Sequence, residues 1–256
     1  GAEALERNAR SVANFVGEAK AAGADEIVAV GTMALRVAEN AADFIARVKE
    51  LCGVELRVLS GEEEAQLSYV AVMSGIKGAA ETDLMTMDTG GGSTEFVFGK
   101  AGKLVRKFSL NVGAVRFTEQ YLAAMPVAAD KLAEAQAAIA KELGDGGVAG
   151  PVAFLVGMGG TVTSMASVKH RMARYDPDAI QGSTLSLNDV NAQIADYAAK
   201  TLEQRREIVG LQPKRADVIL AGACIVKAVL ELTGAKEMTV SDRSLRHGLL
   251  FQLFKV

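Results

Sequence analysis

Apolar residues recur every three or four positions near the start of the chain and predict an amphipathic helix there. Leu5, Val12 and Val16 belong to this pattern, which ends before Gly23. Short β-branched runs at 27–30 and 56–59 predict two strands. A second helical pattern separates them and ends at Gly53, which is typical of a left-handed cap. The predicted order of the first segment is therefore αβαβ.

The middle of the chain changes from a helical to a strand-like pattern. Strands are expected at 84–88, at 95–98, and in a third segment that ends near Leu110. Glycine turns connect them, so the three strands should be antiparallel and begin a second lobe. Further strands are expected at 152–156 and 238–240, between helical patterns, with a closing helix from Leu245. Alternation of helices and strands along the chain predicts an α/β fold.

Composition and charge exclude several classes of protein. The chain has 256 residues, half of them apolar, which is enough for two compact lobes. A net charge of −3 and an isoelectric point near 5.6 give no sign of a DNA-binding surface. No apolar run is long enough to suggest a membrane span. Cys52 and Cys224 lie far apart, which favours reduced thiols and a cytoplasmic location.

The segment 88–95, Asp-Thr-Gly-Gly-Gly-Ser-Thr-Glu, is the strongest local signal for chemistry. Glycines let backbone N–H groups converge on an anion, hydroxyl groups add donors, and carboxylates can hold Mg²⁺ through oxygen. The segment therefore suits phosphate, although an ordinary glycine-rich hairpin is the alternative. The candidate residues are Gly91, Gly92, Ser93 and Thr94 for phosphate, and Asp88 and Glu95 for the metal ion.

A second glycine-rich turn, 157–161, follows a predicted strand and precedes a helix. Its amides and the helix N-terminus could bind another phosphate. The candidate residues are Gly159, Gly160 and Thr161. Val162 occupies the place of the last glycine of a dinucleotide-binding fingerprint, and the chain has no P-loop motif. Both of those nucleotide-binding classes therefore lose support.

Ser60 followed by Glu63 is a capping box and predicts a helix start with Glu64 in the first turn. Acidic residues at this place stabilise the helix dipole, which explains Glu62 and Glu63. Glu64 could instead act as a base on an attacking water. Arg36 could clamp phosphate, because a guanidinium offers paired donors, or could be a solvated surface residue.

Five blocks taken together resemble the exopolyphosphatase and guanosine pentaphosphate phosphohydrolase family in identity and order. The blocks are 31–36, 60–65, 88–95, 157–161 and 241–248. The resemblance implies two actin-like (ribonuclease H-like) domains of α/β class that face each other across a cleft. The expected domains are 1–76, an incomplete N-terminal domain, and 77–243, with a final helix at 244–256 that packs back on the first domain.

The resemblance also implies roles for single residues. Glu64 resembles the general base that activates water, and Asp88 and Glu95 resemble the carboxylates that position Mg²⁺. Arg36 would assist at the cleft, and the glycine turns at 88–95 and 157–161 would hold phosphate. The implied activity is hydrolysis of the terminal phosphoanhydride of inorganic polyphosphate or guanosine pentaphosphate, which stand as alternatives. The resemblance further implies a homodimer.

The sequence departs from the family pattern in three respects. The family's first phosphate hairpin, which resembles Asp-x-Gly-Ser-Asn, has no counterpart before Gly1, so a longer gene product is expected and this chain alone could be inactive. Gln66 stands where a basic residue is common, and Arg243 where a glycine is common. These departures leave two alternatives open: a non-catalytic sensor of polyphosphate or a guanosine alarmone, and a phosphotransferase similar to acetate or sugar kinases.

Overall fold

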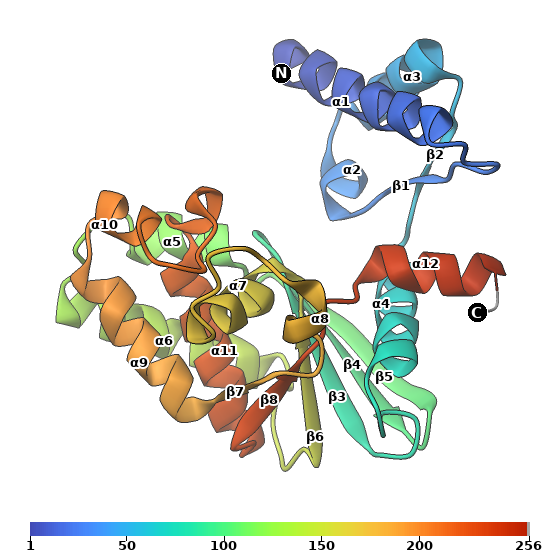
Figure 1. Ribbon diagram of the computed structural model, residues 1–256. Coiled ribbons are helices and arrows are strands. Elements are labelled where there is room, and N and C mark those ends of the chain that lie inside the picture. Colours follow the sequence, from blue (N-terminus) through green and yellow to red (C-terminus); the bar gives the residue numbers. More distant parts are fainter. Residues whose placement is uncertain (255–256) are drawn as a thin grey trace. The chain divides into compact units, whose positions relative to one another are not determined.

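The computed structural model describes residues 1–254, which form two compact units (Figure 1). Unit 1 is Gly1–Glu64, and unit 2 begins at Ala65 and contains the rest of the described chain. The sequence placed the boundary after residue 76 instead. The helix α4 (Gly61–Gly75) begins in unit 1, but its buried face packs against the sheet of unit 2, so most of its contacts lie there. Residues 255–256 of the expected final segment lie outside the described residues.

Unit 1 follows the predicted order of helices and strands. Its elements are α1 (Ala2–Ala21), β1 (Ala29–Gly31), α2 (Met33–Val37), α3 (Ala41–Cys52) and β2 (Leu56–Val58). The two strands pair in parallel, and a small core forms around Ala9, Val48 and Leu56. Gly53 ends α3 with a φ of 76°, as its position predicted. The second helical pattern is two helices rather than one, because Ala38 has an extended backbone.

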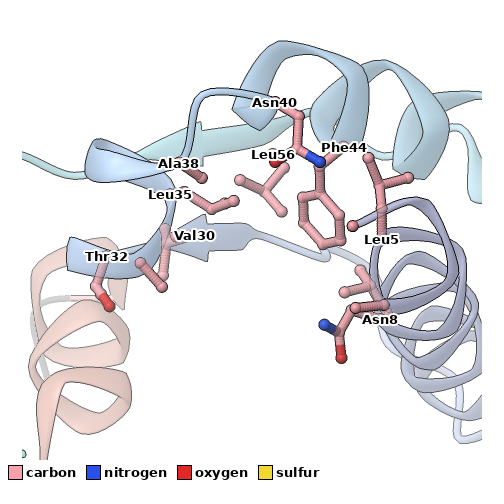
Figure 2. A pocket seen from close by; sticks show the side chains of 14 residues that line it. Leu5, Asn8, Val30, Thr32, Leu35, Ala38, Asn40, Phe44 and Leu56 are labelled. Atoms are coloured by element: carbon pink, nitrogen blue, oxygen red, sulfur yellow. The ribbon is translucent and has the colours of Figure 1, made fainter. Parts of the chain in front are cut away.

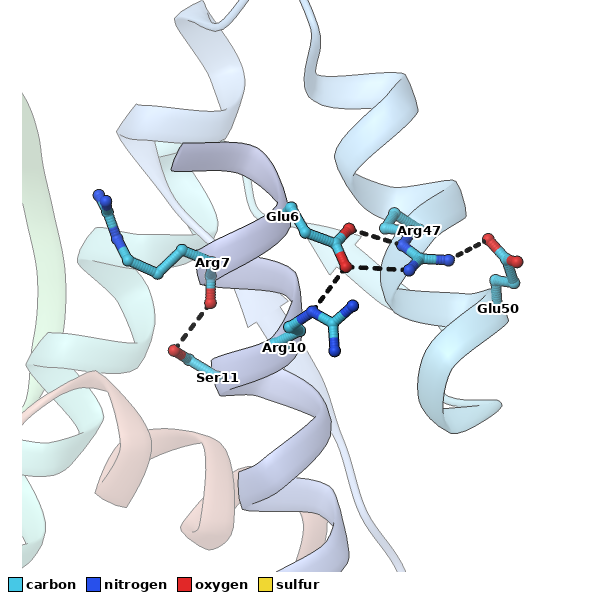
Figure 3. A network of polar contacts seen from close by, with 6 residues as sticks. All are labelled: Glu6, Arg7, Arg10, Ser11, Arg47 and Glu50. Atoms are coloured by element: carbon cyan, nitrogen blue, oxygen red, sulfur yellow. Dashed lines mark hydrogen bonds and ion pairs between the residues drawn. The ribbon is translucent and has the colours of Figure 1, made fainter. Parts of the chain in front are cut away.

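Charged side chains connect α1 to α3 across unit 1 (Figure 3). Arg47 donates from Nε and Nη2 to the two carboxylate oxygens of Glu6, at 2.8 and 2.9 Å. Arg10 donates to the same carboxylate at 2.7 Å, and Glu50 accepts from Arg47 at 2.8 Å. The paired geometry makes the Arg47 contact stronger than a single surface ion pair. Hydrogen bonds from Arg47 lower the pKa of Glu6 from 4.5 to about 2.

This network predicts a pH-dependent stability. Because the pKa of Glu6 is lower in the folded chain, its stabilising effect is complete above about pH 4.5 and is lost as the pH falls to about 2. We expect Glu6→Gln to lower the thermal unfolding midpoint near pH 7 by about one or two degrees, and to change nothing near pH 2. Glu18→Gln, on the exposed surface of the same helix, is the control. Equal midpoints for wild type and Glu6→Gln at pH 7 would contradict this prediction.

Unit 2 is built on a six-stranded mixed sheet with the order β5-β4-β3-β6-β8-β7. Its strands are β3 (Leu84–Thr89), β4 (Thr94–Lys100), β5 (Lys103–Leu110), β6 (Phe154–Met158), β7 (Thr184–Ser186) and β8 (Glu237–Val240). Its helices after α4 are α5 (Ala114–Tyr121), α6 (Ala129–Asp145), α7 (Gly159–Lys169), α8 (Pro177–Ile180), α9 (Leu187–Ala199), α10 (Leu202–Arg206), the 3₁₀ helix η1 (Pro213–Arg215), α11 (Ile219–Thr233) and α12 (Leu245–Phe254).

Helices cover both faces of this sheet. Successive side chains of a strand point to opposite faces. On β3, Leu84 packs with Val72 of α4, whereas Met85 and Met87 join the large core formed with α5, α6, α7, α9 and α11. The closing helix α12 lies against α4, since a Cβ on Gly248 would be 1.8 Å from the carbonyl oxygen of Leu67. Unit 2 is therefore a three-layer α/β/α arrangement, which confirms the predicted class.

Three parallel strands bring their carboxyl ends to one edge of the sheet. β3 pairs with β6 and β6 pairs with β8, with Asp88 beside Met158 and Gly157 beside Val240. Open α/β sheets bind ligands at this edge. The short elements β7 and α8 were not predicted, because three or four residues carry too little periodicity. Within the described part of the chain, no helix combines the length and apolar character needed to cross a bilayer.

Candidate active site

The glycine turn between β3 and β4 has two carboxylates at its base. Asp88 and Glu95 lie directly opposite each other in the strand pairing, so their side chains project from the same face of the sheet. Like charges in such a position destabilise a sheet unless they are compensated. Glu95 Oε1 accepts hydrogen bonds from Ser93 Oγ at 2.7 Å and Ser109 Oγ at 2.8 Å. The serine hydroxyls therefore hold this carboxylate in place.

The start of α5 fixes the direction of the peptide groups in this turn. Ala114 N donates to Gly90 O at 3.0 Å, and Val115 N donates to Gly91 O at 2.9 Å. In a trans peptide, the carbonyl and the N–H that follows it point in opposite directions. The N–H groups of Gly91 and Gly92 are thus directed away from α5. Gly113 permits the contact, since a Cβ there would lie 2.3 Å from the Gly91 oxygen.

The second glycine turn lies directly beside the first. The strand β6 continues to Met158, further than predicted, and α7 begins at Gly159 without an intervening loop. Gly159 has a φ of 81°, and a Cβ on it would lie 2.2 Å from Asp88 Oδ1. Only glycine permits both the backbone conformation and the close approach of this carboxylate. The amides at the start of α7 therefore lie next to the acidic pair, where the helix dipole favours an anion.

A guanidinium group that the sequence analysis did not single out lies over this turn. Arg215, at the end of η1, places its Nη2 atom 1.9 Å from where a Cβ on Gly160 would be. Its Nε atom also donates to Gln212 Oε1 in a long contact of 3.4 Å. Positive charge beside a glycine turn suits phosphate oxygens. No local sequence signal distinguishes Arg215 from other surface arginines, because only the fold brings η1 to α7.

Two hydroxyl groups predicted to contact phosphate are used inside the scaffold. Thr94 is fully buried, and its Oγ1 donates to Val112 O at 2.5 Å. Thr161 is also buried, with its methyl and hydroxyl groups against Gly222 of α11. Because both side chains point into the core, they help to fix the backbone of the two glycine turns. The side chains of Thr94 and Thr161 thus have a structural environment in the core of unit 2.

Glu64 and Arg36 form an ion pair within unit 1. The capping box is present as predicted: Ser60 N donates to Glu63 Oε2 at 2.9 Å, and Glu63 N donates to Ser60 Oγ at 3.1 Å. It begins α4 with Glu64 in the first turn. Arg36 Nη1 lies 2.8 Å from Glu64 Oε2 and donates to Leu59 O at 2.8 Å. The Arg36 side chain is 26% exposed and that of Glu64 18%, so solvent reaches both.

A pocket of about 470 Å³ also lies in unit 1, between α1, α2, α3 and the two strands (Figure 2). Leu5, Val30, Leu35, Phe44 and Leu56 point into it. Of the described residues that line it, none has a charged side chain. Its described lining side chains therefore offer no charge that could compensate a phosphate group.

Arg243 stands where a glycine is common in the family that the sequence resembles. Its side chain is held by contacts within unit 2. Its Nη1 donates to Ser74 O at 2.7 Å, and its guanidinium lies 5.5 Å from the ring of Phe251. The side chain thus joins the end of α4 to α12. The contacts of its guanidinium are therefore with α4 and α12.

The acidic pair fits a magnesium ion that is completed by substrate. In the described part of the chain, no group of three or more His, Cys, Asp and Glu side chains could hold a metal ion by itself. Mg²⁺ is commonly bound through one or two carboxylates together with phosphate oxygens and water. Asp88 and Glu95 provide this number of carboxylates on one face of the sheet. Of the predicted residues, unit 2 thus brings together both glycine turns and both carboxylates, while unit 1 joins Arg36 to Glu64.

Known proteins match nearly the whole chain in sequence. The model of the Ppx/GppA phosphatase family matches residues 2–255. The bifunctional 3-dehydroquinate synthase/phosphatase of Fusobacterium nucleatum is 30% identical over 230 residues, which are 88% of this chain but only 34% of that protein. Exopolyphosphatase 2 of Mycobacterium tuberculosis is 30% identical over 242 residues, 90% of this chain and 75% of that protein.

Solved structures extend the similarity to the fold. The crystal structure of the Aquifex aeolicus member of the Ppx/GppA family has 31% sequence identity and a TM-score of 0.87, and the match covers 99% of this chain and 82% of that one. An exopolyphosphatase from Cytophaga hutchinsonii has 25% identity and a TM-score of 0.86, with 100% and 83% covered. The chain therefore belongs to the Ppx/GppA phosphatase family and has its α/β fold of two actin-like domains.

Proposed function

We propose that this chain forms the catalytic region of a phosphohydrolase that releases the terminal phosphate of inorganic polyphosphate. One observation carries the proposal: the two glycine turns meet at the carboxyl ends of β3 and β6, beside Asp88, Glu95 and Arg215. A phosphate cradle, a pair of carboxylates and a guanidinium are the parts that phosphoryl transfer requires. The names of the similar exopolyphosphatases support polyphosphate as the substrate.

The chain's own residues would bind and orient the terminal phosphoanhydride. The amides of Gly91, Gly92 and Gly160 would donate to phosphate oxygens, and Arg215 would add positive charge beside Gly160. Asp88 and Glu95 would hold Mg²⁺ together with those oxygens, and that ion would neutralise charge on the transferring group. Since each of these groups also contacts a bound substrate before reaction, their first effect is on affinity and orientation.

Glu64 would remove a proton from the attacking water. Its carboxyl group is of a type that serves as a general base, and Arg36 orients it through the 2.8 Å contact. Water attacks the terminal phosphorus, the bridging P–O bond breaks, and the shortened chain leaves with the electron pair of that bond. No covalent nucleophile is needed, because positioned water and neutralised oxygens are sufficient for this chemistry.

The first experiment is to measure phosphate release by the full-length protein, with and without Mg²⁺. Inorganic polyphosphate and guanosine pentaphosphate present the same terminal bond, so both are tested and their kcat/KM values rank them. Release that depends on Mg²⁺ supports the proposal. Binding of either compound without release would indicate a sensor, and phosphate transfer from ATP to acetate or a sugar would indicate a kinase.

Arg215→Met tests the guanidinium over the second turn. We expect KM for polyphosphate to rise about tenfold, because one charge-assisted contact to phosphate is lost, while kcat changes much less. Lys214→Met removes a neighbouring exposed charge and is the matched control. A loss of affinity of the same size in both variants would mean that general positive charge, and not the position of Arg215, is what matters.

A further inference from the structure

Arg205 is a buried cation without an acidic partner. Its side chain is 0% exposed, and none of the ion pairs among the described residues includes it. Nε donates to Tyr197 O at 2.6 Å, Nη1 lies 3.5 Å from Ala216 O, and Nη2 has no hydrogen-bond partner in the described structure. Burying a guanidinium without a carboxylate is costly, so a position that retains one needs an explanation.

The two carbonyl groups that Arg205 contacts belong to different elements. Tyr197 lies in the last turn of α9, and Ala216 directly follows Arg215 at the end of η1. A guanidinium can donate in two directions at once from a rigid plane, which a lysine ammonium on a flexible stem cannot reproduce. Arg205 thus connects α9 to the turn that carries Arg215.

The same segment is also held against α7. Gly210 has a φ of 95°, and a Cβ there would lie 2.4 Å from Ser167 O near the end of that helix. The segment from α10 to η1 therefore has one contact on α7 and another through Arg205 on α9. At its end, the Arg215 guanidinium lies over Gly160, at the opposite end of α7. A small shift of η1 would move this guanidinium away from the glycine turn.

We propose that Arg205 is a positioning residue that fixes η1 so that Arg215 remains over the second glycine turn. The inference deepens the proposed function, since it rests on Arg215 binding phosphate. Arg205 does not reach the turn itself. It acts on the substrate only through the backbone at Ala216, and it therefore affects phosphate affinity only while Arg215 is present.

A double-mutant cycle tests this dependence. Binding of methylenediphosphonate, which has a P–C–P bridge that water does not cleave, is measured by calorimetry with Mg²⁺ on the full-length protein. We expect Arg215→Met to weaken binding about tenfold and Arg205→Met about fivefold. The double variant should bind methylenediphosphonate within about twofold of Arg215→Met alone. If the two losses multiply, Arg205 acts independently of Arg215 and the proposal is wrong.

Two further measurements separate positioning from a general loss of stability. Arg206→Met, at the exposed neighbouring position, is the control and should bind like wild type. If Arg205→Met does not fold, Arg205→Lys replaces it, since lysine keeps the charge but can reach only one of the two carbonyls. Arg205→Lys should still weaken binding in the presence of Arg215 and not in its absence. Unchanged binding by a folded Arg205 variant would overturn the proposal.

Hydrogen exchange distinguishes failure of this inference from failure of the proposed function. If the wild type does not bind methylenediphosphonate, the proposed phosphate site is wrong. The hydrogen-exchange rates of the backbone amides in 212–218 then show whether Arg205 fixes η1. Faster exchange there in Arg205→Met, with α6 unchanged, supports the positioning role, and unchanged exchange contradicts it.

Discussion

Glu64→Gln is expected to reduce phosphate release from polyphosphate by about 10²–10⁴-fold, the range typical of losing a general base. Glutamine has nearly the same shape and keeps an oxygen that can accept the hydrogen bond from Arg36. It cannot accept a proton from water, so the loss should fall on kcat. Affinity for methylenediphosphonate should stay within about threefold of wild type, because binding uses the glycine turns and Arg215.

Glu62→Gln is the matched control for this variant, since it lies in the same helical turn with an exposed side chain. It should keep the activity of the wild type. Full activity of Glu64→Gln would remove Glu64 from the mechanism and leave the base unassigned. If Glu64→Gln lost binding together with turnover, the carboxylate would be needed for the structure of the site and not for proton removal.

Asp88→Asn is expected to lower phosphate release at saturating polyphosphate by about 10–100-fold and to raise the Mg²⁺ concentration needed for half-maximal activity by a similar factor. The reason is the loss of one of two charged oxygen ligands for a hard cation. Asparagine fills the same space beside Gly159, so the turn should keep its shape. Activity is measured as a function of Mg²⁺ concentration at fixed substrate.

Asp83→Asn provides the control, because Asp83 is exposed just before the amino end of β3, whereas Asp88 is near its carboxyl end. It should leave the Mg²⁺ dependence unchanged. An Asp88→Asn enzyme with wild-type Mg²⁺ dependence would show that the ion, if used, is held elsewhere. Glu95→Gln should resemble Asp88→Asn, with an additional effect on the hydroxyls of Ser93 and Ser109.

Much of the candidate site could be predicted because its main parts are local. Three consecutive glycines between two carboxylates form a turn wherever the flanking residues form strands, and the structure pairs Asp88 with Glu95 across that turn. The capping box at Ser60 also depends on residues within one helical turn, and it placed Glu64 at the start of α4 correctly. Roles for these residues remain predictions that the variants above test.

Other parts of the site depend on contacts between distant segments. The sequence pattern gave Thr94 and Thr161 the same standing as the glycines, but the core of unit 2 uses both side chains. Arg36 was predicted as a phosphate clamp that assists at the cleft, and only the fold of unit 1 shows that it pairs with Glu64. Burial and pairing of a side chain depend on which elements pack against it, and no short window of sequence contains that information.

The sequence by itself determined the α/β class, the two glycine turns, the capping box and the left-handed cap at Gly53, because each follows from periodicity or backbone preference over a few residues. Only the tertiary structure decided that Gly159 meets Asp88, that Arg215 lies over Gly160, and that the buried Arg205 contacts the carbonyl groups of Tyr197 and Ala216. The first two contacts join segments more than fifty residues apart in the chain. The pairing of β3 with β6 creates the first of them, because it brings the carboxyl ends of these strands side by side. The others depend on how α9 and η1 pack, which no short window of sequence contains.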